Sequence, residues 1–364
     1  MKLVGAVCHD SNIPVEFVRD NWREITDFTK GITLKSTQES SIAILESVSN
    51  GSEEDEDEEE EDDDGEEEEN DEQPKSYKYD HRQAILYNIS IGATSRELKY
   101  VYENDPKFQL LPSFGVIPFM NQLQDGGFDF NDILKDYNPM KLLHGEHYLK
   151  INKFPIPTSG ELNTKAYPVA VIQKPSKQNN KTNTLLISGY DTINTSTNEV
   201  LFHNQGSYFI KDCSSKTGKS EQFPQNRPVI PFKLPKVDIT NRKPDFEATY
   251  KTSENQASLY RLNADFNPLH IDPQFAKGGG FNKPILHGLC FFGISCKLLV
   301  DHYGSFDEVK LRFTNVVYPG ETLKVVSWDA GNGVIVFQTW VTERKVKVID
   351  LAGIKLVNFG RSKL

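Results

Sequence analysis

The pattern of apolar and polar positions is clearest in the second half of the chain. Apolar residues recur at helical spacing within residues 283–304, at Ile285, Leu289, Phe292, Cys296 and Leu299. Further apolar residues surround them, which predicts a mostly buried helix. Strand-like runs follow at residues 307–320, 321–333, 334–343 and 346–360, divided by Gly, Pro and Asn turns. We therefore expect one long helix wrapped by a curled antiparallel sheet.

An internal repeat indicates that this arrangement occurs twice. QAILY at residues 83–87 and QASLY at residues 256–260 lie 173 positions apart, and the same offset separates Gly115 from Gly288. One shared offset across two separate matches favours duplication. The sequence thus predicts an α+β double hot dog fold, each hot dog repeat having a long helix wrapped by a curled antiparallel sheet. The repeats are expected at residues 75–212 and 236–360, joined by a linker at residues 213–235.

The N-terminal region has a different composition. Residues 1–50 form an extension to which the sequence assigns no function, whereas residues 53–72 hold 18 acids and no base. Self-repulsion predicts that residues 51–74 are a disordered acidic segment, acting as a spacer or as an interaction tail for a basic partner. Outside the run, 41 Lys and Arg face 34 acids, a net charge of +7. With no basic cluster interleaved with aromatic residues, nucleic acid is not the expected partner.

Cysteine usage and the chain ends bear on the compartment. The four cysteines, Cys8, Cys213, Cys290 and Cys296, match neither a disulfide framework nor a zinc site, so we expect reduced thiols and no metal. No apolar run is long enough to cross a bilayer. Residues 361–364 form a tail ending in Ser362, Lys363 and Leu364, which is a receptor-read peroxisomal address. The expected partner there is the peroxisomal import receptor.

The candidate chemistry lies in residues 260–290. Asn267-Pro268 and Asp272-Pro273 each combine a capping side chain with Pro at the first helical position, which predicts a compact, fixed loop. Asp265 and His270 lie on this loop and can converge on one small volume. These two side-chain types are the usual proton carriers near neutral pH. A structural role explains the caps but leaves this pair unused, so we interpret it as an acid–base pair.

Gly288 is the second candidate, because it lies near the expected start of the buried helix. Backbone N–H groups there have no intrahelical partner, and the helix dipole is positive. Glycine lets a ligand oxygen approach the amide closely, which suits the negative charge that develops on a thioester oxygen. The alternative is that Gly288 only allows close packing of helix and sheet.

At these residues the chain resembles the type 2 enoyl-CoA hydratases of the MaoC-like family, including the hydratase 2 domain of peroxisomal multifunctional enzyme type 2. The matching positions are Tyr260, Asp265, Asn267, Pro268, His270, Ala276, Pro284, His287 and Gly288. The resemblance extends over about residues 77–360. It implies peroxisomal β-oxidation, reversible hydration of trans-2-enoyl-CoA to (3R)-3-hydroxyacyl-CoA, no cofactor besides the CoA of the substrate, and a homodimer.

The resemblance also implies roles for individual residues. Asp265 and His270 would activate one water, Asn267 would orient that water or the Asp, and the Gly288 amide would bind the thioester oxygen. Substrate contacts would carry over to four further residues, His144, Gly145, Lys174 and Phe313. With the repeat offset, Gly92 and Glu97 stand where the second half has Asp265 and His270. The first half is therefore expected to complete the fold and form an acyl-chain groove.

Two departures and two alternatives stay open. The family favours a small hydroxyl residue and Gly before the catalytic Asp, whereas this chain has Asn263 and Ala264, which could shift the loop if positive φ is needed there. No dehydrogenase or sterol-carrier segment is evident, which favours a stand-alone hydratase. A catalytically weak acyl-CoA-binding or scaffold protein is the alternative. A thioesterase is less favoured, because the Asp-x-Asn-Pro-x-His loop is typical of hydratases.

Overall fold

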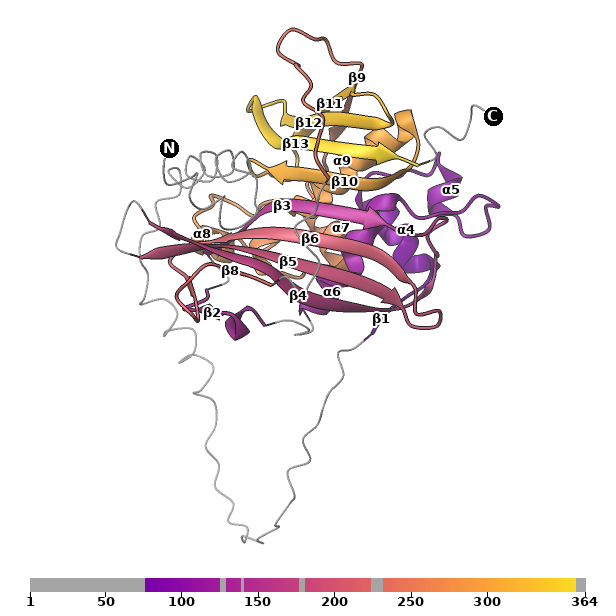
Figure 1. Ribbon diagram of the computed structural model, residues 1–364. Helices are drawn as coiled ribbons and strands as arrows, with labels where there is room; N and C mark the ends of the chain where they lie inside the picture. Colours follow the sequence, from indigo (N-terminus) through magenta and orange to yellow (C-terminus); the bar gives the residue numbers. More distant parts are fainter. Residues whose placement is uncertain (1–75, 125–128, 139–140, 177–180, 224–231, 358–364) are drawn as a thin grey trace, which may run out of the picture.

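The computed structural model describes residues 76–124, 129–138, 141–176, 181–223 and 232–357. Eleven strands form one antiparallel sheet in the order β1-β4-β5-β6-β3-β10-β13-β12-β11-β9, with β8 beside β4 (Figure 1). The first half contributes β1 (Tyr77–Tyr79), β3 (Leu142–Ile151), β4 (Gly160–Pro175), β5 (Thr182–Asn194) and β6 (Val200–Ile210), and the segment after it contributes β8 (Glu221–Gln222). The second contributes β9 (Phe246–Lys251), β10 (Phe306–Phe313), β11 (Thr322–Asp329), β12 (Val334–Val341) and β13 (Val346–Leu356). A separate pair joins β2 (Leu134–Lys135) to β7 (Ser214–Ser215).

The two halves join edge to edge where β3 pairs with β10. Leu149 lies opposite Val309 in this antiparallel pair, and both side chains are buried in the core. Side chains alternate between the two faces of a strand, so every second residue of β3 and β10 points toward the helices. Each of the four strand-like runs expected after residue 306 forms a strand, β10 to β13, which confirms that part of the prediction.

Helices cover one face of the sheet (Figure 1). They are α4 (His81–Ser90), α5 (Leu98–Val101), α6 (Ile117–Gln124), α7 (Gln256–Ala264), α8 (Pro273–Gly278) and α9 (Gly288–Tyr303), with 3₁₀ turns η1 (Pro112–Val116), η2 (Phe130–Asp132) and η4 (Pro268–His270). Among these described helices none is both long and apolar enough to span a membrane.

The repeat appears in space as contacts between equivalent residues. Tyr87 of α4 and Tyr260 of α7 stand 173 positions apart, and their ring centroids are 6.5 Å apart. At the same offset, Asn263 donates from Nδ2 to Ser90 Oγ at 3.1 Å. Two equivalent positions can touch only close to the axis that relates the repeats. Helices α4 and α7 therefore flank an internal pseudo-two-fold axis.

The central helices match the expectation in the second half only. Helix α9 begins at Gly288, where the sequence placed its start, and His287 precedes it with an extended ψ of 135°. Its residues Phe292, Cys296 and Leu299 are fully buried, as their spacing predicted. In the first half, the expected long helix is instead the turn η1 followed by the short helix α6. The double hot dog architecture is thus present, with unequal central helices.

The segment expected to be a linker packs onto the outer face of the sheet. It contributes β7 and β8, and the Phe232 ring lies 6.2 Å from that of Tyr148 in β3. Leu234 lies over Gly353 of β13, so close that a Cβ added to Gly353 would be 2.5 Å from Leu234 Cδ2. This part of the chain therefore covers sheet from both halves.

Candidate active site

The loop of residues 265–273 is built as its capping residues predicted. Helix α7 ends at Ala264, and the Asn267 side-chain oxygen accepts from Leu269 N at 3.0 Å to start η4. Asp272 caps α8 by accepting from Gln274 N at 2.7 Å. These side-chain caps occupy backbone donors that a helix start leaves unpaired, which fixes the loop.

Asp265 and His270 face one another across this loop. Asp265 Oδ2 lies 3.8 Å from His270 Nε2, and Asp265 Oδ1 accepts from Asn267 N at 3.2 Å. His270 Nδ1 donates to the Ile285 carbonyl at 2.8 Å, which leaves Nε2 as the basic nitrogen of the neutral ring. Burial lowers the pKa of His270, and the neighbouring Asp265 opposes this shift. The pair is too far apart for a direct hydrogen bond and can share a water.

Asn267 contributes to this geometry through its backbone. Its side chain is exposed and its Oδ1 serves as the cap for Leu269, while its N–H holds Asp265. The orientation of Asp265 by Asn267 thus rests on the main-chain amide of Asn267.

His287 is a member of the site whose role the sequence did not reveal. Its ring stacks on that of His270, with centroids 3.7 Å apart and planes 26° apart, and its Nε2 donates to the Asp265 carbonyl at 3.1 Å. His287 Nδ1 is buried and has no hydrogen-bond partner among the described residues. Burial holds the pKa of His287 well below its usual value, and His270 lowers it further. His287 therefore joins the Asp265 loop to the start of α9.

Gly288 is the first residue of α9 and is only partly covered, whereas His287 and Leu289 beside it are buried. A Cβ at this position would lie 3.4 Å from the Phe313 ring, a tight contact. The ring of Phe313 in turn lies 5.2 Å from that of His144. Three residues expected at the site, Gly288, Phe313 and His144, are thus brought together.

Gly145 and Lys174 lie in the first-half part of the sheet. Gly145 marks a register shift between β3 and β6, where His144 and Glu146 pair with successive residues of β6. Lys174 lies in β4 opposite Asn183 of β5. The expected targeting residues, Ser362 to Leu364, lie outside the described residues, as do the N-terminal extension and the acidic run.

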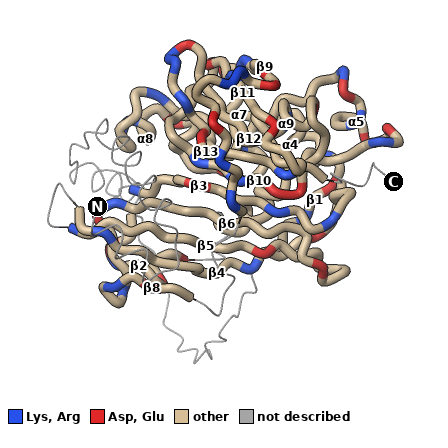
Figure 2. The backbone as a smooth tube through the Cα atoms, turned by 45° about the horizontal axis from the view of Figure 1, so that its top comes forward, with Lys and Arg blue, Asp and Glu red and all other residues tan. Residues whose placement is uncertain are grey.

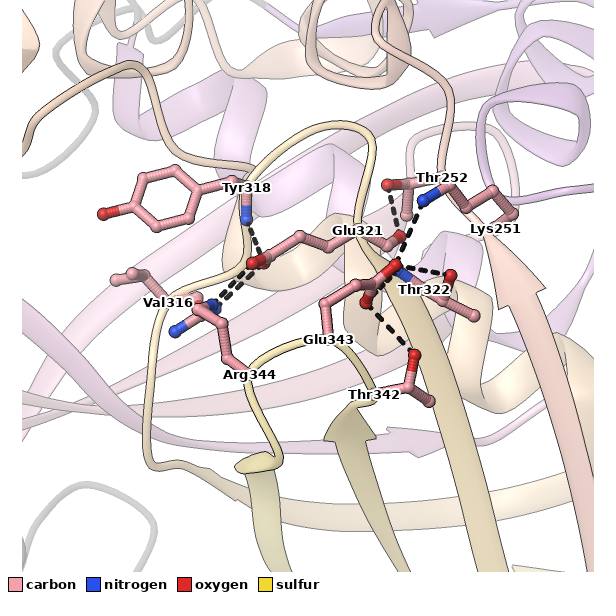
Figure 3. Close-up of polar contacts among 9 residues, drawn as sticks. All are labelled: Lys251, Thr252, Val316, Tyr318, Glu321, Thr322, Thr342, Glu343 and Arg344. Carbon is pink, nitrogen blue, oxygen red and sulfur yellow. Dashed lines mark hydrogen bonds and ion pairs between the residues drawn. The ribbon is translucent and has the colours of Figure 1, made fainter.

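A polar network supports the start of α9 from the β10–β11 loop (Figure 3). Leu286, two residues before Gly288, donates its N–H to the Val317 carbonyl at 2.7 Å. Arg344 donates to the Val316 carbonyl at 2.6 Å and to Glu321 Oε2 at 2.9 Å, and Glu321 accepts from Tyr318 N at 2.8 Å. This network fixes the loop that positions Leu286.

Positions equivalent to the acid–base pair are structural in the first half. Glu97, the counterpart of His270, accepts from the buried Lys297 Nζ at 2.8 Å. Gly92, the counterpart of Asp265, has a φ of +103° and lies against Tyr250. Glu97 thus forms an ion pair and Gly92 has no side chain that could carry a proton, so neither position offers a second copy of the Asp265–His270 pair.

The departure at residues 263–264 leaves the loop unstrained. Ala264 ends α7 in helical conformation and is buried, so the positive φ that would have disfavoured its methyl group does not occur. Asn263 donates to Tyr260 O at 2.9 Å and to Ser90 Oγ, so it ties α7 to α4.

Comparisons with known proteins agree with this fold. Residues 77–212 match the MFE-2 hydratase 2 N-terminal domain, and residues 236–352 match the MaoC like domain. A crystal structure of a MaoC-like dehydratase from Phytophthora capsici has 28% identity and a TM-score of 0.63, covering 78% of this chain and 94% of that one. The chain belongs to the MaoC-like type 2 hydratase family.

Two relatives place the chain more closely within this family. Enoyl-CoA hydratase 2, peroxisomal, of Arabidopsis thaliana is 32% identical, with 76% of this chain covering 92% of that protein. Peroxisomal hydratase-dehydrogenase-epimerase of Saccharomyces cerevisiae is 42% identical over 99% of this chain. The chain spans 37% of the length of that yeast protein.

Proposed function

We propose that the protein is a hydro-lyase that reversibly hydrates trans-2-enoyl-CoA to (3R)-3-hydroxyacyl-CoA in peroxisomal fatty acid β-oxidation. The observation that carries the proposal is the 3.8 Å gap between Asp265 Oδ2 and His270 Nε2, with His270 held in one tautomer by Ile285. One water fits between two acceptors at this spacing. The names of the relatives supply the substrate class and the compartment.

In the proposed reaction, His270 Nε2 takes a proton from this water while the water oxygen bonds to C3 of the substrate. The electron pair of the double bond moves toward the thioester, and the N–H groups at the start of α9 around Gly288 stabilise the oxygen that becomes negative. The Asp265–His270 pair then returns the proton to C2 on the same face. All atoms of one water are added, and no redox partner is required.

The substrate contacts and the partners in this proposal rest on the resemblance to the family. His144, Gly145, Phe313 and Lys174 bind the acyl-CoA, and the first two lie on β3 near the start of α9. The homodimer and the import receptor are further predictions.

Geometry favours water over a metal ion between these residues. Asp265, His270 and His287 offer ligand atoms within 4.8 Å of one another. However, the two imidazole rings are stacked, and their lone pairs lie in nearly parallel planes. Both nitrogens cannot point at one ion at a bond length of about 2.1 Å. We therefore expect turnover to survive dialysis against EDTA, and loss of turnover that zinc restores would contradict this.

The reaction is tested by mixing the purified protein with trans-2-decenoyl-CoA and following the absorbance of the conjugated thioester. The absorbance is expected to fall as the double bond is hydrated. A protein that binds the thioester without consuming it would instead be the acyl-CoA-binding alternative.

Removing His287 should affect turnover more than substrate binding. In His287→Phe the stack on His270 is kept, but the hydrogen bond to the Asp265 carbonyl is lost. We expect kcat to fall by about 10–100-fold with little change in KM, because misplacing a catalytic pair by a fraction of an ångström is costly. Steady-state kinetics check this, and an equal loss in Tyr303→Phe, at the far end of α9, would show a general effect of altering the helix.

The pH dependence should follow the neutral form of His270. Since burial lowers its pKa below 6.5, the basic form persists into mildly acidic solution and is lost only below that pKa. We expect the acid limb of kcat/KM to have its midpoint below pH 6.5. A midpoint above 7 in a pH–rate profile would contradict a buried, neutral His270.

A further inference from the structure

Two buried imidazole nitrogens in the first half have no hydrogen-bond partner among the described residues. His147 is 2% exposed, and its Nε2 lies 3.0 Å from Asn204 Oδ1. Asn204 donates from Nδ2 to the Gly115 carbonyl at 2.9 Å, so its oxygen is the acceptor for His147. The hydrogen of the neutral His147 ring is therefore on Nε2, and Nδ1 carries a lone pair. That Nδ1 is shielded from solvent and has no hydrogen-bond partner among the described residues.

His144 provides the second such nitrogen. Its ring meets that of His147 edge to face, with centroids 5.3 Å apart, and its Nε2 is also shielded and unpartnered within the described chain. Burial lowers the pKa of His144 to about 4, so the ring is neutral. As a residue His144 is only half-buried, and its ring contacts Phe313 beside Gly288. The pair therefore begins one ring away from the glycine where the thioester is proposed to bind.

Aromatic side chains form the surrounding walls. Phe119 stacks on His147 at 5.4 Å and on Tyr190 at 4.7 Å. Tyr190 and Tyr208 share a hydrogen bond of 3.1 Å between their hydroxyls, and the Tyr208 ring contacts that of His144 at 4.9 Å. The tyrosine hydroxyls are thus already paired, whereas the two imidazole nitrogens are not.

We propose that His147 Nδ1, with the ring of His144 beside it, forms a subsite for a hydroxyl group carried by the acyl chain. This inference rests on the proposed function and narrows its substrate class to acyl-CoA thioesters with a hydroxyl beyond the reacting carbons. A hydroxyl donates its one hydrogen to His147 Nδ1. His144 hydrogen-bonds to the backbone of Glu146, and because its Nε2 has no partner among the described residues, its hydrogen lies on Nδ1 and its Nε2 is a second acceptor. A methylene in place of the hydroxyl leaves His147 Nδ1 buried and unpaired.

The expected preference follows from that difference. A buried polar group left without its hydrogen bond is costly, and a site built to bind a hydroxyl discriminates strongly against an analogue that lacks it. We expect kcat/KM to be at least about tenfold higher for a correctly placed hydroxyl than for the plain chain.

The test compares trans-2-decenoyl-CoA with analogues that carry one hydroxyl at each position from C5 to C10. At least one analogue is expected to exceed the plain thioester tenfold in kcat/KM with the wild-type protein. In His147→Phe this ratio should fall to about one. The new phenyl ring can still stack on Phe119, but the acceptor nitrogen Nδ1 is lost. Should His147→Phe fail to fold, as judged by circular dichroism, His147→Leu takes its place, because it also removes the acceptor.

A matched control is His203→Phe. His203 is a buried histidine of β6 in the same half, but it is paired with Asp191 at 2.6 Å and belongs to neither proposed site. Its variant should keep the preference. Two results would overturn the subsite. One is a kcat/KM ratio of about one for every analogue with the wild-type protein, as a permanently bound water would give. The other is a preference for a hydroxylated analogue that survives in His147→Phe. If no thioester is turned over, the proposed function fails. The subsite is then tested by calorimetry, which compares the dissociation constants of the plain and the hydroxylated thioesters.

Discussion

Replacing Asp265 by Asn, or His270 by Asn, is expected to lower kcat/KM for trans-2-decenoyl-CoA by about 10²–10⁴-fold, the usual worth of a positioned acid–base group. Asp265→Asn removes the charge next to His270 Nε2, and His270→Asn removes the base that Ile285 orients. Because the two side chains act on one water, the double variant should be little worse than the more damaging single one. Steady-state kinetics on the three variants measure this.

Asp272→Asn is the matched control for this prediction. Asp272 lies on the same loop and caps α8, and Asn is an equally good cap. Near-normal kinetics are expected for it. Near-normal kinetics for Asp265→Asn or His270→Asn would show that the acid–base pair is not where the chemistry occurs.

The largest effect on stability is expected where the two halves join. Arg312 of β10 donates to Glu146 of β3 from Nε at 3.0 Å and Nη2 at 2.9 Å, and both residues are at most 5% exposed. Figure 2 shows Lys or Arg and Asp or Glu positions close together around β10. Glu146→Leu leaves the Arg312 charge buried without this partner, which should lower the free energy of unfolding by about 3–5 kcal/mol. Urea denaturation measures the loss.

The double variant Glu146→Leu/Arg312→Met separates pairing from packing. Replacing both charges by apolar groups of similar size should recover most of the lost stability, since the pair must repay its own desolvation. Removing Glu199 from its exposed pair with Lys153 should change stability far less. A Glu146→Leu variant as stable as the wild type would show that solvent reaches Arg312 in the native state.

Local patterns predicted much of the fold because each depends on nearby residues. The four strands after residue 306 follow turn residues and alternation, and the repeat offset anticipated a second copy of the same architecture. The start of α9 near Gly288 was also predicted. Ile285 fits the helical spacing but lies before the helix, because the backbone at His287 is extended.

The features that the sequence could not predict depend on contacts between residues that are far apart in the chain. The loop containing Asp265 and His270 was recognisable from its own caps. The role of His287 depends on a hydrogen bond to a carbonyl 22 positions away, and the Glu146–Arg312 pair spans 166 positions. The imidazole pair His144 and His147 became apparent only once Asn204 and Phe119 were seen to fix the second ring. Such relations depend on which elements pack together within each half and between the halves.

In the proposed reaction, one water held between Asp265 and His270 adds to C3 of the enoyl thioester from a single face. The most direct measurement is chiral analysis of the alcohol formed from trans-2-decenoyl-CoA by the wild-type protein and by Asp265→Asn. We expect the 3R alcohol from the wild type and almost no product from the variant. A 3S product, or the 3R product formed equally fast by both proteins, would contradict it.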